Sequence, residues 1–168
     1  VDFALFTLKV FDDIVLKNPL YLDLITSDVY VHRTYSMGMV DTQNRVNFYD
    51  GMIRVVDPDG KEFVKYAPKD YLSVIAEHVE PWTYLKFPYL RARGWRGFVE
   101  GPDSPVYGAG PLARLNVAER MATPEAEAAR QELFATRGGR PSGAMLAHHW
   151  ARLVEMLFAA ERLNALLD

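Results

Sequence analysis

Cysteine is missing from all 168 residues of this chain. Its absence excludes disulfide bonds, iron–sulfur ligation and thiol catalysis by the chain itself, because each of these needs a cysteine sulfur. No apolar run approaches the roughly 20 residues that a membrane-spanning helix needs. An excess of positive charge is also missing, since the formal net charge is −3. We therefore expect no sequence-independent nucleic-acid binding, which requires a basic surface.

The usual catalytic and nucleotide-binding motifs are absent as well. The sequence contains no G-x-G-x-x-G, P-loop, H-E-x-x-H or G-x-S-x-G pattern. It begins at Val1 without an initiator methionine or an apolar leader, which favours an excised fragment without a signal peptide. What remains is ordinary globular composition, 49% hydrophobic and 24% charged, enough for one core of normal size.

The first third of the chain changes from helical to β-favouring patterns. Residues 1–17 form an expected amphipathic helix whose apolar positions recur at three- and four-residue spacing. These positions are Phe3, Phe6, Val10 and Ile14. A β-favouring stretch then runs over residues 29–38.

Three short strand candidates follow, at Val46–Tyr49, Ile53–Val56 and Glu62–Tyr66. The segments between them, Asp50-Gly51 and Asp57–Gly60, are typical of tight turns because glycine and aspartate tolerate positive φ. The pattern predicts a small antiparallel meander within residues 29–66.

Helix and aromatic loop are expected next. Pro68 opens a predicted helix that runs to about Val79. Residues 80–110 combine glycine, proline and many aromatic side chains. This stretch is too long for a plain connector and too aromatic for a solvated linker. We expect it to pack against polypeptide outside this chain.

The last third is predicted to be helical. One helix covers residues 111–121, and a second begins at Thr123-Pro124 and ends at Gly138-Gly139. Ser142 is expected to cap a long final helix that carries Trp150, Leu153 and Leu157. Its apolar face is so broad that we expect this chain to leave part of it uncovered, and the fragment to form a homodimer.

Together these patterns predict an α+β fold, with helices packed around a small antiparallel β-meander and a long C-terminal helix. One fragment of four parts is expected. Residues 1–28 are helical, 29–66 form the meander, 67–110 form a helix plus the aromatic loop, and 111–168 are helical.

Three polar clusters invite a chemical interpretation. His148, Arg152 and Glu155 share one helix face, where a salt-bridge network is favoured over a metal site. The segment from Glu77 to Glu80 contains a histidine near a predicted helix end, which the helix dipole alone explains. The run Asp57–Glu62 lacks the spacing of a calcium loop and is interpreted as a turn.

Four longer runs resemble one known family. Val46–Gly51, Ile53–Phe63, Ala76–Leu90 and Gly110–Asn116 are similar to the large subunit of nickel–iron hydrogenases. Within that family the resemblance is to the soluble, cytoplasmic, multi-subunit class of methyl-viologen-reducing or NAD-reducing type. Two further runs share it, Thr34–Asp41 and Leu146–Arg162.

The resemblance implies a metal centre that this chain does not hold. Such subunits carry nickel and iron, with cyanide and carbon monoxide on the iron, on four cysteines in two Cys-x-x-Cys pairs. Since both pairs are missing, the resemblance implies a central scaffold fragment, inactive alone, with no catalytic, metal-binding or cofactor-binding residue. The activity that the resemblance implies for the intact complex is reversible oxidation of hydrogen.

The implied partners are the remainder of the large subunit, electron-acceptor reductase subunits and an iron–sulfur small subunit. Six residues are candidates for buried pairing or for the interface with these partners: Lys86, Arg114, Trp82, Tyr84, Arg152 and Glu155. Two alternatives stay open. The first is a non-catalytic hydrogenase-related subunit, such as the quinone-site relative in respiratory complex I, and the second is a free-standing interaction domain.

Overall fold

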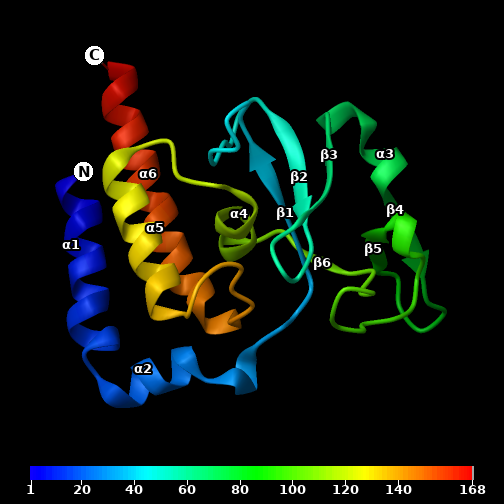
Figure 1. Ribbon diagram of the computed structural model, residues 1–168, viewed down its shortest axis with the longest axis horizontal. Helices are drawn as coiled ribbons and strands as arrows, with labels where there is room; N and C mark the ends of the chain where they lie inside the picture. The colour runs from blue at the N-terminus through cyan, green and yellow to red at the C-terminus, as the bar shows by residue number, and fades with distance from the viewer. Residues whose placement is uncertain (168) are drawn as a thin grey trace.

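A computed structural model describes residues 1–167. A layer of helices lies at one end of the molecule, a four-stranded sheet lies in the middle, and a two-stranded arm lies at the other end (Figure 1). Both termini lie on the helical side. The predicted α+β class with a long final helix is confirmed. No helix within residues 1–167 combines the length and apolarity needed to cross a membrane.

Four helices make up the helical layer. They are α1 (Asp2–Phe11), α2 (Pro19–Thr26), α5 (Pro124–Thr136) and α6 (His148–Leu167). A π-helical turn at Asp12–Leu16 extends α1. α1 and α5 both pack on α6 and cover its apolar face.

The final helix is covered more completely than expected. Trp150 and Leu157 are buried within this single chain, and Leu153 is half-buried. The expectation of an uncovered helix was therefore wrong for this part of α6, because α1 folds back across the molecule to cover it. Towards the end of α6, Leu163 and Leu166 are exposed.

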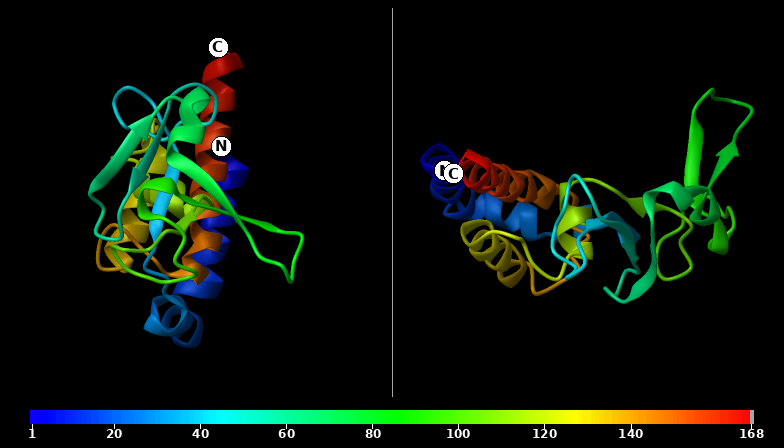
Figure 2. Two further views of the ribbon diagram at one scale, coloured as in Figure 1. Left: turned by 90° about the vertical axis from the view of Figure 1, so that its right-hand side faces the viewer. Right: turned by 90° about the horizontal axis from the view of Figure 1, so that it is seen from above.

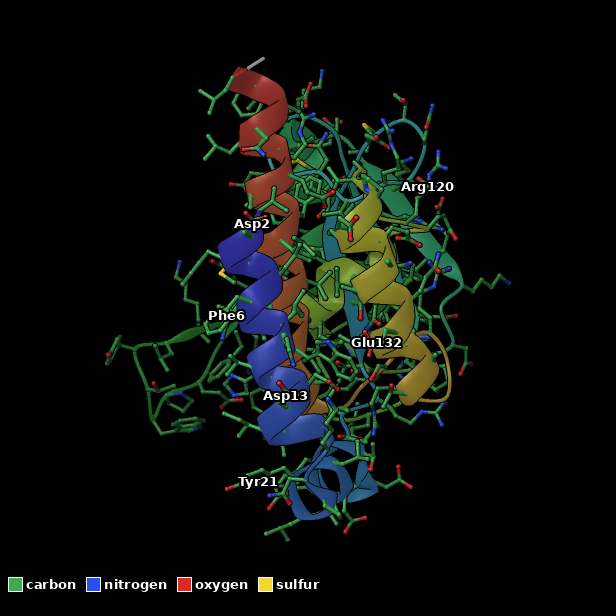
Figure 3. All side chains as sticks on the ribbon, turned by 90° about the vertical axis from the view of Figure 1, so that its left-hand side faces the viewer. Asp2, Phe6, Asp13, Tyr21, Arg120 and Glu132 are labelled. Atoms are coloured by element: carbon green, nitrogen blue, oxygen red, sulfur yellow. The ribbon has the colours of Figure 1, made fainter. Side chains whose placement is uncertain are left out.

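The first helix turns the opposite face inward from the one we predicted. Phe6 is exposed (Figure 3). Ile14 is exposed as well, and Phe3 is 72% exposed. Ala4 is buried instead, and Leu8 packs against the core. The helix carries apolar side chains on two faces, and only packing against α6 decides which face is buried.

The central sheet has the strand order β3-β2-β1-β6. β1 (Tyr35–Val40), β2 (Met52–Val56) and β3 (Glu62–Tyr66) pair antiparallel, and β6 (Tyr107–Gly108) pairs parallel to β1. The predicted meander is confirmed at β2 and β3. Asp57 stabilises the turn between them, since its carboxylate accepts hydrogen bonds from the backbone N–H groups of Asp59 and Lys61 at 2.9 Å.

The strand predicted at Val46–Tyr49 does not form. Only Val46 makes an isolated bridge, to Val40, and residues 47–51 are a bend. Gly51 is required there for another reason: a Cβ atom at this position would lie 2.3 Å from the Val40 carbonyl oxygen. Close backbone approach, rather than a tight hairpin turn, therefore explains this glycine.

The helix predicted from Pro68 to Val79 is only half correct. A 3₁₀ turn at Pro68–Asp70 leads into a single α-helical turn, α3 (Tyr71–Val74). The chain then extends as β4 (Ile75–Val79), which pairs antiparallel with β5 (Lys86–Leu90). A partner strand inside the supposed aromatic loop thus overrides the helical periodicity.

Helix α4 (Pro111–Val117) connects the sheet to the helical layer. Asn116 on this helix is buried and donates a hydrogen bond to the Ser142 carbonyl oxygen at 2.8 Å. Because α6 begins only at His148, Ser142 lies too far upstream to cap the final helix as predicted. A 3₁₀ turn at Met145–Ala147 precedes α6 instead.

Candidate docking surface

The β4–β5 hairpin projects from the body of the protein as an arm (Figure 2). Its register pairs Ile75 with Leu90 and Val79 with Lys86. The two strands form a sheet of their own, separate from the central sheet. A two-stranded hairpin is only marginally stable in water, so its side chains must supply further contacts.

A cluster of aromatic rings provides part of that stabilisation. The His78 ring stacks on Trp95, with centroids 4.5 Å apart and an angle of 14° between the planes. Phe87 contacts Trp95 at 5.8 Å and Phe98 at 5.4 Å. Trp82 lies against Phe87 at 5.9 Å. These offset and edge-on contacts stabilise the arm beyond their buried area.

The outer part of the arm is apolar and open to solvent. Trp82 is 71% exposed and Tyr84 is 95% exposed. Val79, Leu85 and Phe98 are exposed beside them. Several large apolar side chains gathered on one projection are typical of a surface that a partner covers.

Arg93 attaches the base of the arm to the central sheet. Its guanidinium donates a hydrogen bond to the Tyr35 hydroxyl at 2.5 Å and lies 4.9 Å from the centre of the Phe63 ring. Burial raises the pKa of Tyr35 against the opposing effect of Arg93. The arm therefore projects from an ordered base.

The six predicted residues fall in two separate places. Trp82, Tyr84 and Lys86 lie on the arm, where Lys86 pairs with Glu77 across the strands at 3.0 Å. Arg114 and Glu155 meet between α4 and α6, as described next. Arg152 is exposed on α6.

Arg114 and Glu155 form a two-pronged ion pair. The Arg114 Nε and Nη2 atoms donate to the Glu155 carboxylate at 2.6 and 2.8 Å. The Phe48 ring lies 5.5 Å from the guanidinium. The salt-bridge network expected around His148, Arg152 and Glu155, within the helix or to another helix, takes the second form at Glu155, because α4 packs directly on α6.

His148 lies at the same junction. Its Nδ1 atom is 3.5 Å from the Leu112 N–H, and its ring touches Gly110, where a Cβ atom would lie 2.8 Å from Cε1. Burial, and then the positive charges of Arg152 and Arg114, lower the pKa of His148. The histidine therefore serves packing in its neutral form.

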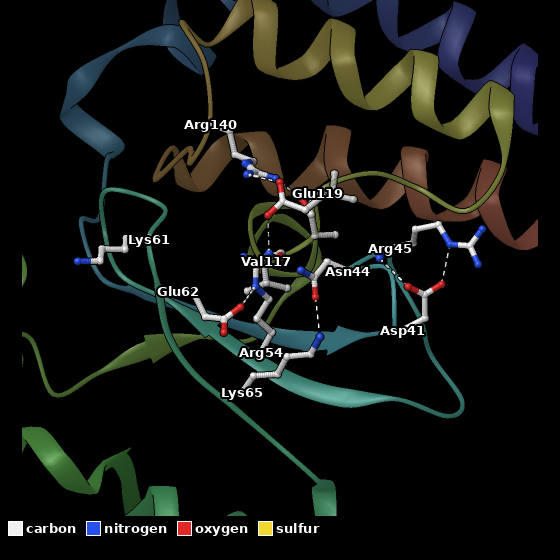
Figure 4. A network of polar contacts seen from close by, with 12 residues as sticks. Asp41, Asn44, Arg45, Arg54, Lys61, Glu62, Lys65, Val117, Glu119 and Arg140 are labelled. Atoms are coloured by element: carbon white, nitrogen blue, oxygen red, sulfur yellow. Dashed lines mark hydrogen bonds and ion pairs between the residues drawn. The ribbon is translucent and has the colours of Figure 1, made fainter.

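A buried arginine that the sequence reasoning missed links the sheet to the segment after α4 (Figure 4). Arg54 donates to Glu62 at 2.7 Å, to Glu119 at 2.8 Å and to the Val117 carbonyl oxygen at 2.5 Å. Arg140 donates to the other carboxylate oxygen of Glu119 at 2.9 Å. Burial alone would raise the pKa of Glu119, and the two arginines outweigh it and lower that pKa.

One signal of this network was visible in the sequence. Arg54 interrupts an otherwise apolar strand of the meander, and Glu62 begins the strand beside it. The remaining partners come from residues 117–140, which no local pattern connects to β2.

A hollow of about 520 Å³ lies between α4, β6 and the segments around His32 and Ser142. Arg33 and Arg137 reach its rim, but Arg33 pairs with Asp59 at 3.0 Å and Arg137 donates to the Ile25 carbonyl oxygen at 3.0 Å. Each arginine thus has a partner within the protein.

Residues 1–167 contain no group of three histidine, aspartate or glutamate side chains placed to hold a metal ion. The donor set also does not fit an iron–sulfur cluster, because every such cluster needs cysteine thiolates and the chain has none. The exposed aromatic side chains of the projecting arm make it the candidate docking surface.

This combination of fold and sequence is similar to that of hydrogenase subunits. No family model matches the chain. An iron–sulfur subunit of the F420-non-reducing hydrogenase from Archaeoglobus profundus is 45% identical over 162 residues, which cover 96% of this chain and 33% of that protein. The beta subunit of the NAD-reducing hydrogenase HoxS of Cupriavidus necator is 34% identical over 167 residues, covering 99% of this chain and 32% of that protein.

A solved structure supports the same similarity in three dimensions. The crystal structure of an NAD+-reducing NiFe hydrogenase in the H2-reduced state matches with a TM-score of 0.83 and 33% identity. The match covers 99% of this chain and 35% of that one. The chain thus spans about a third of the length of the relatives it matches.

These comparisons correct the predicted subunit. The Archaeoglobus relative is described as an iron–sulfur subunit, and neither it nor the HoxS beta subunit is described as a nickel-bearing large subunit. The assignment to a large-subunit fragment, and with it the nickel–iron centre, is replaced by the broader similarity to hydrogenase subunits. The runs that suggested it contain no metal ligand, so they reflect a shared fold and cannot specify a cofactor.

Proposed function

We propose that this chain is a non-catalytic segment of a hydrogenase-related subunit, which holds that subunit in a cytoplasmic oxidoreductase complex through its β4–β5 arm. The similarity to hydrogenase subunits over nearly the whole chain supports the class of complex. The chemistry of hydrogen oxidation and electron transfer would then belong to other parts of the complex, whose cysteines can bind metals.

The observation that carries this proposal is the open aromatic surface of the arm. Trp82 and Tyr84 expose most of their side chains on a hairpin that stands away from the core. Aromatic side chains of this kind dominate the energetics of protein interfaces, since each buries 150–250 Å² when covered. A partner surface that covers the arm would also stabilise the hairpin.

The test is to purify the hydrogenase complex through an affinity tag on the polypeptide that carries this chain. Trp82→Ala and Tyr84→Ala should each reduce the amount of co-purifying hydrogenase subunits, identified by mass spectrometry, by about tenfold or more. Hydrogen-dependent dye reduction in the purified fraction should fall in proportion.

Phe3→Ala is the matched control, because Phe3 is 72% exposed and Trp82 is 71% exposed, but Phe3 lies on α1. This variant should leave the complex intact. Retention of all subunits by both arm variants would show that the arm is not the docking surface. An equal loss caused by Phe3→Ala would contradict the proposal as well.

A further inference from the structure

The hollow beside α4 and β6 is lined by polar and apolar side chains together. Its volume of about 520 Å³ lies within the usual range of pockets that bind small molecules. Two of its polar residues, Ser36 and Asn116, are only 7% and 4% exposed. Its apolar surface includes Val31, Val106 and Leu112. This combination is typical of a site that holds a small polar group attached to an apolar one.

Arg137, directly after α5, lines this hollow with a guanidinium that is only partly hydrogen-bonded. Its Nη1 atom donates to the Ile25 carbonyl oxygen at 3.0 Å. Its Nε atom is buried without a hydrogen-bond partner, and Nη2, which is not buried, has no partner within residues 1–167. A buried donor without an acceptor costs free energy, because water no longer bonds to it. The Nε–Nη2 edge of Arg137 therefore lacks its acceptors.

Arg114 shows how this chain satisfies the same edge elsewhere. Its Nε and Nη2 atoms donate to the two oxygens of the Glu155 carboxylate at 2.6 and 2.8 Å. A carboxylate suits this edge because its two oxygens match the two parallel N–H groups. Arg93 and Arg130 also have a buried Nε without a partner, but each guanidinium lies 4.9 Å from the centre of an aromatic ring. Of the three, Arg137 is the one that borders the hollow.

The charges around the hollow favour an anion with a single charge. Arg33 and His32 border it as well, but Arg33 pairs with Asp59 at 3.0 Å and His32 with Glu100 at 2.8 Å. None of the lining residues within the described chain is a lysine. A doubly charged phosphate would need a second unpaired cation, whereas a carboxylate needs only the edge of Arg137.

We infer that this hollow binds a monocarboxylate, which accepts two parallel hydrogen bonds from the Nε–Nη2 edge of Arg137. The apolar part of the lining favours a carboxylate attached to a short aliphatic chain. A free small molecule and an acidic side chain of another polypeptide both present these two oxygens, and the experiments below distinguish them. The β4–β5 arm has no part in this binding.

Nuclear magnetic resonance of the purified 168-residue chain tests the edge directly. Butyrate should move the Nε–H resonance of Arg137 downfield until it saturates, with a Kd of about 1 mM. The Nε–H resonance of Arg114 should stay in place, because Glu155 already occupies its edge. Acetate should bind about tenfold more weakly, since it buries two fewer CH₂ groups. The absence of a saturable shift at Arg137, or tighter binding of inorganic phosphate than of butyrate, overturns the inference.

Three variants, each checked for folding by circular dichroism, assign the binding to the hollow. Arg137→Lys keeps the charge but lacks the two-donor edge, so it should weaken butyrate binding by about tenfold. Asp28→Asn should strengthen it by roughly twofold, because Asp28 places a negative charge at the hollow. Arg120→Lys is the matched control, since Arg120 is exposed and donates to Gln43 away from the hollow. Equal weakening by both lysine variants would contradict a site at Arg137.

Equilibrium dialysis of the tagged hydrogenase complex with radiolabelled butyrate separates the two sources of the carboxylate. Binding to the wild-type complex beyond that to the Arg137→Lys complex assigns the site to a free small molecule. If only the isolated chain binds butyrate, an acidic side chain of another polypeptide occupies the edge in the complex. Neither result depends on Trp82 or Tyr84, so loss of butyrate binding leaves docking through the arm untouched, and the reverse holds as well.

Discussion

A tryptophan side chain is buried in the helical layer, whereas another is exposed on the arm. Trp150 on α6 is 1% exposed and packs against Phe11 at 5.7 Å. Trp82 on the arm is 71% exposed, although it also contacts a phenylalanine. The helical layer buries its tryptophan in a core, although Phe3 and Phe6 on its outer face are exposed, whereas the arm leaves Trp82 open to solvent. Under the proposed function, folding depends on the first tryptophan and docking on the second.

Replacing each of these two tryptophans should give the largest difference in the free energy of unfolding between the two regions. Trp150→Ala should lower the free energy of unfolding by about 3–5 kcal/mol, because it leaves a large cavity under α1. Trp82→Ala should change it by less than about 1 kcal/mol, since little of that ring is buried. Urea unfolding followed by circular dichroism measures both. Equal effects would show that the arm belongs to the cooperative core.

A second contrast compares an ion pair from each region. Arg114→Ala should lower the free energy of unfolding by about 2–3 kcal/mol, because it leaves the Glu155 carboxylate half-buried without its two donors. Lys86→Ala removes an exposed pair with Glu77 and should cost less than about 0.5 kcal/mol.

Arg114→Lys sharpens this contrast. Lysine keeps the charge but cannot donate two parallel hydrogen bonds, so its effect should be intermediate. Chemical denaturation of the three variants measures the order. A loss from Lys86→Ala as large as that from Arg114→Ala would contradict the difference between the two regions.

The smallest expected effect is a pH dependence confined to the helical side. The pKa of His148 is lowered in the folded protein, so the unfolded chain binds a proton more readily. The stability that this contributes is complete above about pH 6.5, the pKa of an unperturbed histidine, and is lost as the pH falls through the folded value.

His148→Gln should reduce the change in unfolding free energy between pH 8 and pH 5.5. His149→Gln is the control, because His149 is the exposed neighbour on the same helix. Urea titrations at the two pH values test both variants. An unchanged pH dependence in His148→Gln would rule out this histidine as its source.

Prediction from local sequence was correct where the residues of one short segment determine its structure. The turn at Asp57–Gly60 fixes the β2–β3 hairpin, because Gly60 adopts a φ of +85° and Asp57 binds the turn amides. The end of α5 at Gly138-Gly139 follows from the positive φ of both glycines. The docking role of Trp82 and Tyr84 remains a prediction from their aromatic surroundings.

Prediction from local sequence was wrong where one segment can form either of two structures. Ile75–Val79 continues a helical periodicity, but pairing with β5 converts it to a strand. The network around Arg54 could not be predicted, since Glu119 and Arg140 approach it only through the tertiary fold. The prediction of a large-subunit fragment was wrong for a related reason. The runs that match the family contain no metal ligands, so they do not identify the subunit.

The sequence by itself determined the α+β class, the turn between β2 and β3, the long final helix and the lack of any thiolate ligand. These depend on backbone preferences and composition within a few neighbouring residues. Only the tertiary structure decided which face of α1 is buried, that Arg114 meets Glu155, and that an unpaired strand edge projects with its aromatic side chains. Each of these depends on contacts between residues distant in the chain, which local patterns do not encode.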